Sequence, residues 1–272
     1  MIIQHNMQAA NANRMLGNVV NAQSKSTEKL SSGYRINRAA DDAAGLSISE
    51  KMRAQVRGLD KAATNAQDGI SLIQTAEGAL NETHSILQRM RELCVQAAND
   101  TEVDKDRDAI KEELTQLTEE IDRIATTTQF NTMNLLDGSF TGKKLQIGAN
   151  KDQNMDIEID NMQSGAIGIT GVDAQVATHA DASAAISTVN AAIETVSQTR
   201  SKLGAIQNRL EHTINNLQTS SENLQAAESR IRDVDMASEM VSYSKNNILQ
   251  QASQAMLAQA NQTTQGVLSL LQ

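Results

Sequence analysis

The segment ISTVNAAIETVSQTRSKLGAIQNRLEHTINNLQTSSENLQAAESRI, residues 186–231, carries the most regular apolar pattern in this chain. Alternate steps of three and four residues from Ile186 meet mostly apolar side chains, and the predicted buried seam consists of Ile193, Val196, Leu203, Leu210, Ile214, Leu217 and Leu224. This spacing places one narrow apolar line along an α-helix, which is typical of a coiled coil. We expect a helix over residues 184–234, roughly 75 Å long at about 1.5 Å per residue, that needs partner helices along its length.

Residues 45–128 contain those partners. A helical pattern runs from Gly45 to Ala98 and includes a second heptad series, formed by Ile73, Ala76, Leu80, Thr83, Leu87, Met90, Cys94 and Ala97. After a break at 99–101, with Thr101 as the expected N-cap, apolar residues return at helical spacing at Ile110, Leu114, Leu117, Ile121 and Ile124. So short a connection predicts a second, antiparallel helix of about 25 residues.

Residues 129–172 differ in character from the helical segments. Glycines separate short runs in which apolar and polar residues alternate, such as KLQIGA and MDIEID. This pattern indicates two or three short hairpin strands. Residues 173–182 carry weak signals and are expected to form a loop. The predicted fold is therefore mainly α, a long antiparallel coiled-coil bundle with a small β-hairpin region.

The two ends of the chain, residues 6–31 and 236–272, are amphipathic but rich in small and polar residues. Helices with such narrow apolar faces gain little by burial and are marginal in water on their own. Residues 34–43 lose the helical period and are expected to form an elbow. This pattern indicates that the termini become ordered together with neighbouring molecules.

Composition supports the bundle and excludes several classes of function. The 272 residues include two Phe, two Tyr, no Trp and no Pro, which predicts a thin aliphatic core and long unbroken helices. The formal charge is −9 without a basic stripe, so nucleic acid is not an expected partner. No apolar run is long enough for membrane insertion, and residues 1–23 do not resemble a secretory signal. Taken alone, these features indicate a cytosolic protein.

No catalytic, metal or cofactor site is expected. The four histidines, His5, His84, His179 and His212, are far apart in sequence and none belongs to an H-E-x-x-H motif. Cys94 lies on the second heptad series, which favours buried packing over a reactive thiol. The sequence predicts a protein that is not an enzyme.

Long motifs at both ends resemble the bacterial flagellins. They are EKLSSGYRINRAADDAAGLSISEKMRAQVRGL (28–59), AQDGISLIQTAEGALNETHSILQRMRELCVQAAND (66–100), RSKLGAIQNRLEHTINNL (200–217), AAESRIRDVDMASEM (226–240) and NNILQQASQAMLAQANQTTQGVLSLL (246–271). The opening IIQHN is similar to the start of the family, with Gln4 where Asn is usual. The resemblance covers about residues 1–140 and 185–272 and implies a short form that lacks the variable outer domains.

This resemblance implies a structural subunit that polymerises into a flagellar filament for swimming. Residues 1–44 with 236–272 would form the inner tube as a coiled coil of terminal helices, and residues 45–235, with a hairpin cap at 129–172, the outer tube. The implied inner-tube contacts are Met7, Val19, Val20, Ile248, Leu249, Met256, Leu257, Leu268, Leu270 and Leu271. The implied partners are further copies of the chain, an export chaperone, the filament cap and the junction proteins at the filament base. The family leaves the cell by type III export without a cleaved signal, which replaces the cytosolic interpretation by an extracellular one.

The family also implies a surface recognised by the Toll-like flagellin receptor of animal hosts. Its motif matches LQRMREL and IKEELT, with Arg89 and Leu93 on one helical face and Glu113 on the facing helix. The alternative interpretation is an exposed ion pair of little energetic consequence. Leu268, Leu270 and Leu271 also resemble leucines that cytosolic flagellin receptors sense.

Two other functions remain open at this point. A hook–filament junction protein shares the terminal helices but has a more divergent bundle, and a cytosolic coiled-coil scaffold would stop at a defined oligomer. Sedimentation separates the three possibilities, because only a flagellin grows from seeds into micrometre filaments.

Overall fold

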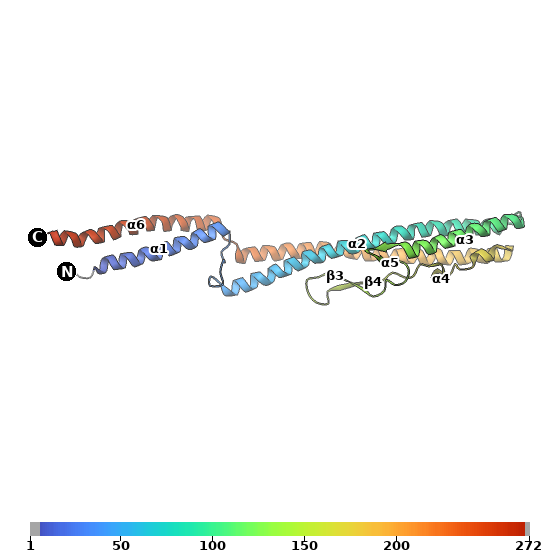
Figure 1. The fold of residues 1–272 in the computed structure, drawn as a ribbon, viewed down its shortest axis with the longest axis horizontal. Helices are drawn as coiled ribbons and strands as arrows, with labels where there is room; N and C mark the ends of the chain where they lie inside the picture. Colours follow the sequence, from blue (N-terminus) through green and yellow to red (C-terminus); the bar gives the residue numbers. More distant parts are fainter. Residues whose placement is uncertain (1–5, 270–272) are drawn as a thin grey trace. The chain divides into compact units, whose positions relative to one another are not determined.

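The computed structural model of the protein describes residues 6–269, and the side chains of residues 6–262. Its elements in chain order are α1 (Met7–Ser32), α2 (Ala43–Ala97), α3 (Asp104–Thr127), β1 (Gln129–Phe130), β2 (Met133–Asn134), β3 (Lys143–Gln146), β4 (Asn154–Ile157), α4 (Ser164–Ile167), the 3₁₀ helix η1 (Val172–Val176), α5 (His179–Arg232) and α6 (Met236–Ser269) (Figure 1). The mainly α class with a small β region is confirmed.

The chain divides into two compact units. Unit 1 comprises Met1–Gln55 and Glu222–Gln272, and unit 2 comprises Val56–Ser221. The sequence placed the division at the elbow, between residues 44 and 45 and between 235 and 236. The structure places it within α2 and α5, because the elbow after α1 is hydrogen-bonded to the end of α5 and so belongs to unit 1.

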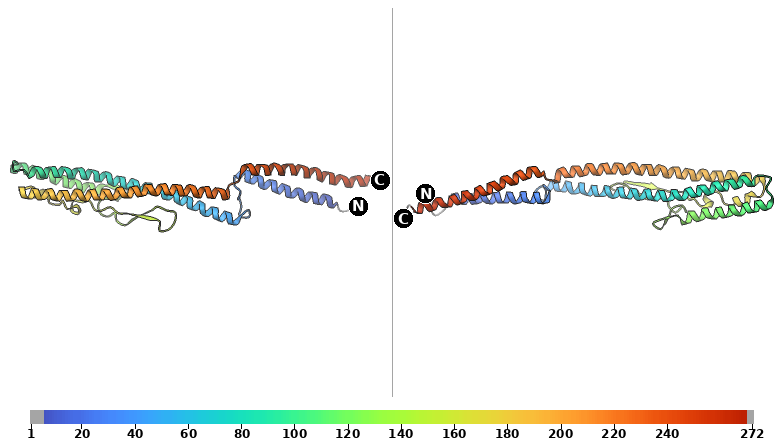
Figure 2. Two further views of the ribbon diagram at one scale, coloured as in Figure 1. Left: turned by 180° about the vertical axis from the view of Figure 1, so that it is seen from behind. Right: turned by 90° about the horizontal axis from the view of Figure 1, so that it is seen from above.

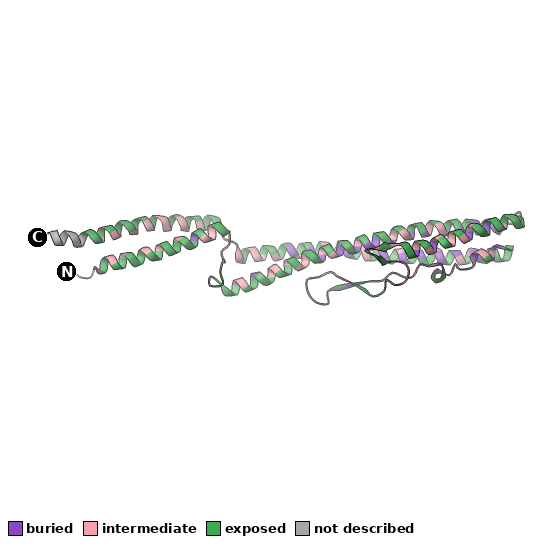
Figure 3. Cartoon of the chain, in the orientation of Figure 1, coloured by how far each residue is buried: buried purple, intermediate pink, exposed green. Residues whose placement is uncertain are grey.

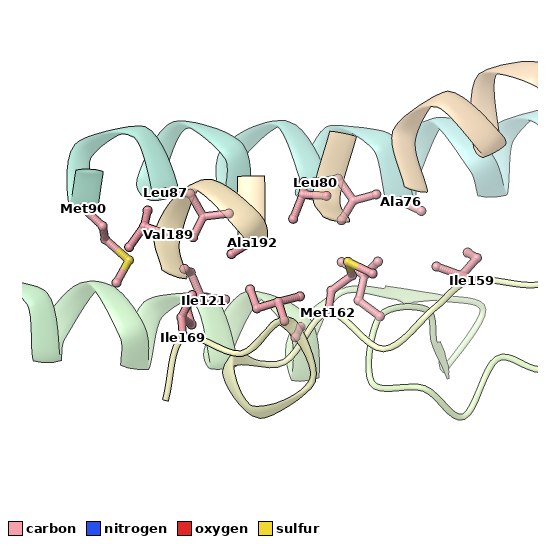
Figure 4. Packing of buried hydrophobic residues seen from close by; sticks show 14 of the residues in the cluster. Ala76, Leu80, Leu87, Met90, Ile121, Ile159, Met162, Ile169, Val189 and Ala192 are labelled. Atoms are coloured by element: carbon pink, nitrogen blue, oxygen red, sulfur yellow. The ribbon is translucent and has the colours of Figure 1, made fainter. Parts of the chain in front are cut away.

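Unit 2 is built around the apolar line of α2. All eight residues of the predicted second heptad series are buried: Ile73, Ala76, Leu80, Thr83, Leu87, Met90, Cys94 and Ala97. They meet Ile110, Leu114 and Ile121 of α3, whereas Leu117 and Ile124 are half-buried at its margin. Figure 4 shows side chains of α2, α3, α5 and the segment after β4 pointing toward one another in this core.

The buried face of α5 differs from the expected seam at three of its seven residues. Val196, Leu203, Leu210 and Leu217 are buried, but Ile193, Ile214 and Leu224 are half-buried. The other buried line consists of Ala185, Ala192 and Thr199, one residue before the expected positions. Small side chains can be buried where there is no room for larger ones, and Ile193 and Ile214 remain half-buried.

Two antiparallel hairpins follow α3. β1 pairs with β2 across a turn in which Asn131 and Thr132 have positive φ. β3 pairs with β4 in the register Leu145↔Met155, and alternation in β4 buries Met155 and Ile157. The loop between β3 and β4 contacts α2 where Gly58 leaves room, since a Cβ there would lie 2.8 Å from the Cβ of Ala149.

Some local expectations were wrong. Thr101 does not cap α3, which begins at Asp104 with Val103 as its N-cap residue. The carboxylate of Asp106 instead accepts from the backbone N–H of Val103 at 3.4 Å. A side chain in the first turn of α3 therefore caps the start of this helix. The expected loop at 173–182 contains most of η1 and the start of α5, because tertiary burial of Val176 and Ala182 holds a weakly signalled segment in place.

Candidate assembly surface on the terminal helices

Both ends of α1 are capped by the local sequence. The side-chain oxygen of Asn6 accepts from the backbone N–H of Ala9 at 3.0 Å, which satisfies a free donor in the first turn. Gly33 ends the helix at φ 74° and donates its N–H to the carbonyl of Lys29 at 2.9 Å. Glycine reaches this left-handed conformation without strain, so the chain leaves α1 at this residue.

The elbow after α1 is joined to the segment between α5 and α6. The backbone N–H of Arg35 donates to the carbonyl of Arg232 at 2.7 Å, and the N–H of Val234 donates to the carbonyl of Gly33 at 3.0 Å. The guanidinium of Arg232 lies 4.7 Å from the centroid of the Tyr34 ring, a cation–π contact. These contacts bring the ends of α1 and α5 together and set where α6 begins.

A carboxylate holds the turn that leads into α2. The backbone N–H groups of Arg38 and Asn37 donate to Asp41 and lower the pKa of that carboxyl group. The neighbouring Asp42 accepts from the backbone N–H of Gly45 at 2.8 Å, within the first turn of α2. The elbow is therefore an ordered turn with its own hydrogen bonds.

α1 and α6 lie side by side and antiparallel in both views of Figure 2. The side-chain amide of Asn6 donates to the carbonyl of Ala260 at 2.9 Å near one end of the pair. Lys29 and Glu239 form an ion pair at 3.8 Å near the other end. Asp235 begins α6 by accepting from the backbone N–H groups of Ala237 and Ser238.

This pair of helices buries very little of itself. Ser26 is the only buried residue of α1, and none of the described side chains of α6 is buried (Figure 3). The exposed large apolar residues instead gather on these two helices, namely Met7, Met15, Val20, Met236, Met240, Val241, Ile248, Leu249 and Met256. A soluble monomer seldom exposes so many apolar side chains together, so the α1–α6 surface has the properties of a protein–protein contact.

The predicted inner-tube residues fall into three groups. The exposed group consists of Met7, Val20, Ile248, Leu249 and Met256. The second group, Val19 and Leu257, is half-buried. Leu268, Leu270 and Leu271 lie outside the residues whose side chains the structure describes. The sequence pattern marks Met15 and Met240 as apolar members of the terminal helices, without assigning them to the inner tube. Met236 and Val241 were not predicted, and their helical spacing was the available signal.

The expected receptor surface lies on unit 2. Arg89 donates to Glu113 at 2.9 Å and to Glu92 at 3.3 Å, and these hydrogen bonds raise the pKa of Arg89. Leu93, expected to offer an apolar contact beside them, is buried with 2% of its surface exposed. Leu93 therefore does not offer an exposed apolar contact beside Arg89, because it belongs to the hydrophobic core of unit 2.

Nothing in the described part of the chain forms a metal-binding group of His, Cys, Asp or Glu side chains. Cys94 is buried among apolar side chains, and this burial raises the pKa of its thiol to about 11. Within residues 6–269 no helix is both long enough and apolar enough to span a bilayer.

Comparison with known proteins identifies the family. The N-terminal helical region of bacterial flagellin matches residues 3–141, and its C-terminal helical region matches residues 186–271. A flagellin of Halalkalibacterium halodurans is 58% identical over 271 residues, and the alignment covers 100% of both chains. The chain belongs to the bacterial flagellins. A flagellar filament 31.3 kDa core protein of Treponema maltophilum is 51% identical to this flagellin over 286 residues, again covering 100% of each chain.

A putative flagellar hook-associated protein from Vibrio parahaemolyticus has the same fold. It superposes with a TM-score of 0.61 at 14% identity, covering 71% of this flagellin and 100% of that chain. The likeness extends to the fold alone, whereas the relatives at high identity are filament proteins. This flagellin is a structural subunit of the flagellar filament, an extracellular appendage, and the junction-protein alternative is not favoured.

Proposed function

We propose that this flagellin polymerises through the exposed apolar surface of the α1–α6 pair, defined by Met7, Met15, Val20, Met236, Met240, Val241, Ile248, Leu249 and Met256. The observation that supports this most strongly is that 67% of the surface of Ile248 and 71% of that of Val241 are exposed on helices with hardly any buried residue. Covering such side chains with neighbouring copies removes apolar area from water, which supplies the driving force for growth.

In this proposal residues 1–44 and 236–272 form the inner tube, and residues 45–235 the outer one. Val19 and Leu257 would be covered together with the exposed set, and Leu268, Leu270 and Leu271 are proposed as further inner-tube contacts from the family resemblance. The support for this assignment is a difference in burial: unit 2 has a hydrophobic core, whereas α1 and α6 bury almost none of their described side chains.

The proposal is tested with two point variants and a truncation. Ile248→Gln places a polar side chain on the α1–α6 surface, while Val95→Gln makes the same kind of change on an exposed residue of α2 in unit 2. We expect seeded sedimentation to show lost growth for Ile248→Gln and for deletion of residues 236–272, and normal growth for Val95→Gln. Equal growth of all the variants would contradict the proposal.

We further propose that the chain is exported through the flagellar type III channel with α1 and α6 not yet folded, and that an export chaperone holds the C-terminal segment. The small buried area of these helices supports this, because little stabilisation is lost when they are unfolded. The filament cap and the junction proteins at the filament base would contact the same α1–α6 surface at the two ends of the filament.

We propose that the host Toll-like flagellin receptor binds at Arg89 and Glu113. Leu93 is buried on the same helical face as Arg89 and would hold α2 in place beneath the site. The exposed guanidinium of Arg89, held by Glu113 and Glu92, can rearrange to meet a partner. Arg89→Ala is expected to weaken binding to the receptor ectodomain. Arg123→Ala, which removes another exposed Arg paired with Glu120, is the matched control and should bind normally.

A further inference from the structure

Methionine is distributed unevenly between the two units. Of the six exposed methionines among residues 6–262, five lie on the terminal helices: Met7, Met15, Met236, Met240 and Met256. The sixth is Met133 in β2 of unit 2. Met90, Met155 and Met162 are buried in the core of unit 2. The surface that this flagellin is proposed to bury on assembly is therefore the one richest in accessible thioethers.

We propose that the five exposed methionines of α1 and α6 are oxidation sites, and that their conversion to sulfoxides by a peroxide before assembly blocks filament growth. The inference rests on the proposed role of the α1–α6 pair in polymerisation. Oxidation of methionine turns a flexible apolar side chain into a polar one, and it is reversed by methionine sulfoxide reductases. The modification would therefore act as a reversible stop on growth.

The chemistry is a two-electron oxidation with hydrogen peroxide as the oxidant. The lone pair of the thioether sulfur attacks one peroxide oxygen, an S–O bond forms and the O–O bond breaks. The proton on the attacked oxygen passes to the departing hydroxide, which leaves as water. The sulfur loses two electrons and the peroxide gains them. Access decides which residue reacts, and Met7 and Met256 expose 72% and 66% of their surface, whereas Met90 exposes none.

The effect on assembly follows from what the interface must bury. A sulfoxide oxygen is a strong hydrogen-bond acceptor, and an apolar contact between helices offers it no donor. Burying it unpaired raises the critical concentration for growth by about tenfold for each such site. α1 and α6 together contain one aromatic residue, Tyr243, so the flexible methionine side chains supply much of the apolar contact area in the proposed interface. Their oxidation would therefore remove much of that contact.

The test starts from the full-length monomer. It is treated with hydrogen peroxide, the peroxide is removed with catalase, sulfoxides are mapped by peptide mass spectrometry, and growth on seeds is followed by sedimentation. We expect sulfoxides at the five terminal-helix positions and not at Met90, Met155 or Met162. The critical concentration for growth should rise by at least about tenfold. Treatment with reductases for both sulfoxide epimers should restore growth.

Substitution separates these sites from other oxidation. The variant with Leu at Met7, Met15, Met236, Met240 and Met256 should grow equally well before and after peroxide. Met133→Leu, the matched control on unit 2, should remain sensitive. If the variant with five Leu substitutions does not grow at all, the reductase treatment of the unsubstituted protein is the deciding test. Recovery of filament growth after that treatment supports the proposal, and no recovery overturns it.

Three results would overturn the inference: normal growth of monomer that carries the five sulfoxides, absence of those sulfoxides after treatment, or a variant with five Leu substitutions that grows untreated but is inhibited by peroxide. Its failure is distinct from failure of the polymerisation proposal. Normal growth of oxidised protein together with lost growth of Ile248→Gln removes only the oxidation inference. Normal growth of Ile248→Gln removes the assembly role of the surface itself.

Discussion

Leu210 exposes none of its surface in the core of unit 2. Replacing it with Ala removes buried methyl groups and leaves a cavity, so Leu210→Ala should lower the free energy of unfolding by about 2–5 kcal/mol. Leu224, half-buried on the same helix, is the control and should cost less when replaced by Ala. Urea unfolding followed by circular dichroism measures both values. A loss below about 0.5 kcal/mol for Leu210→Ala would mean that the residue is not a core position.

Cys94 gives a residue-scale prediction for pH. Burial raises its thiol pKa from 9.0 to about 11, and the thiolate is the reactive form. A maleimide at pH 8 should therefore not label the native chain and should label it in urea. Between pH 9 and 11 the unfolded chain loses the thiol proton while the folded chain keeps it, so folding stability falls as pH rises through this window. Cys94→Ala should show a smaller fall over the same range, and an identical fall would contradict the assignment.

At the scale of the helices, the two units should differ in local stability. α1 and α6 bury almost nothing, whereas ordering a backbone costs about 1–2 kcal/mol per residue, so these helices should open easily in the monomer. We expect fast amide hydrogen exchange at residues 10–30 and 245–262, and slow exchange at 203–217 of α5. In assembled filaments the terminal segments should become protected. Equal protection of both regions in the monomer would contradict coupled folding and assembly.

At the scale of the whole molecule, charge is separated along the chain. The excess of acidic over basic residues, −9 in total, arises entirely between residues 56 and 221, because the remaining residues carry a slight positive excess. In the proposed filament, acidic regions of neighbouring copies that lie near one another would repel, and salt screens such repulsion beyond about 8 Å at physiological ionic strength. Raising sodium chloride from low to physiological concentration should therefore lower the critical concentration for growth, as measured by sedimentation. A critical concentration that rises with salt would show that attractive ion pairs dominate between copies.

Much of this architecture can be read from periodicity alone. The apolar series of α2 was placed residue by residue, and Val196, Leu203, Leu210 and Leu217 of α5 were identified as well. Spacing of three and four residues defines one face of a helix whatever that helix packs against, and the absence of Pro allows the helices to continue. The dense terminal motifs likewise indicate the family from the sequence alone.

Other features depend on which elements pack together, and periodicity does not contain that information. Ala185, Ala192 and Thr199 form a buried line of α5, although small residues give a weak apolar signal in the sequence. Leu93 is buried within the core of unit 2, and the turn after α1 is held by hydrogen bonds to residues some 200 positions later. Burial is a property of a side chain and its neighbours together, so the local pattern sets which residues share a helical face and the tertiary contacts set which faces meet.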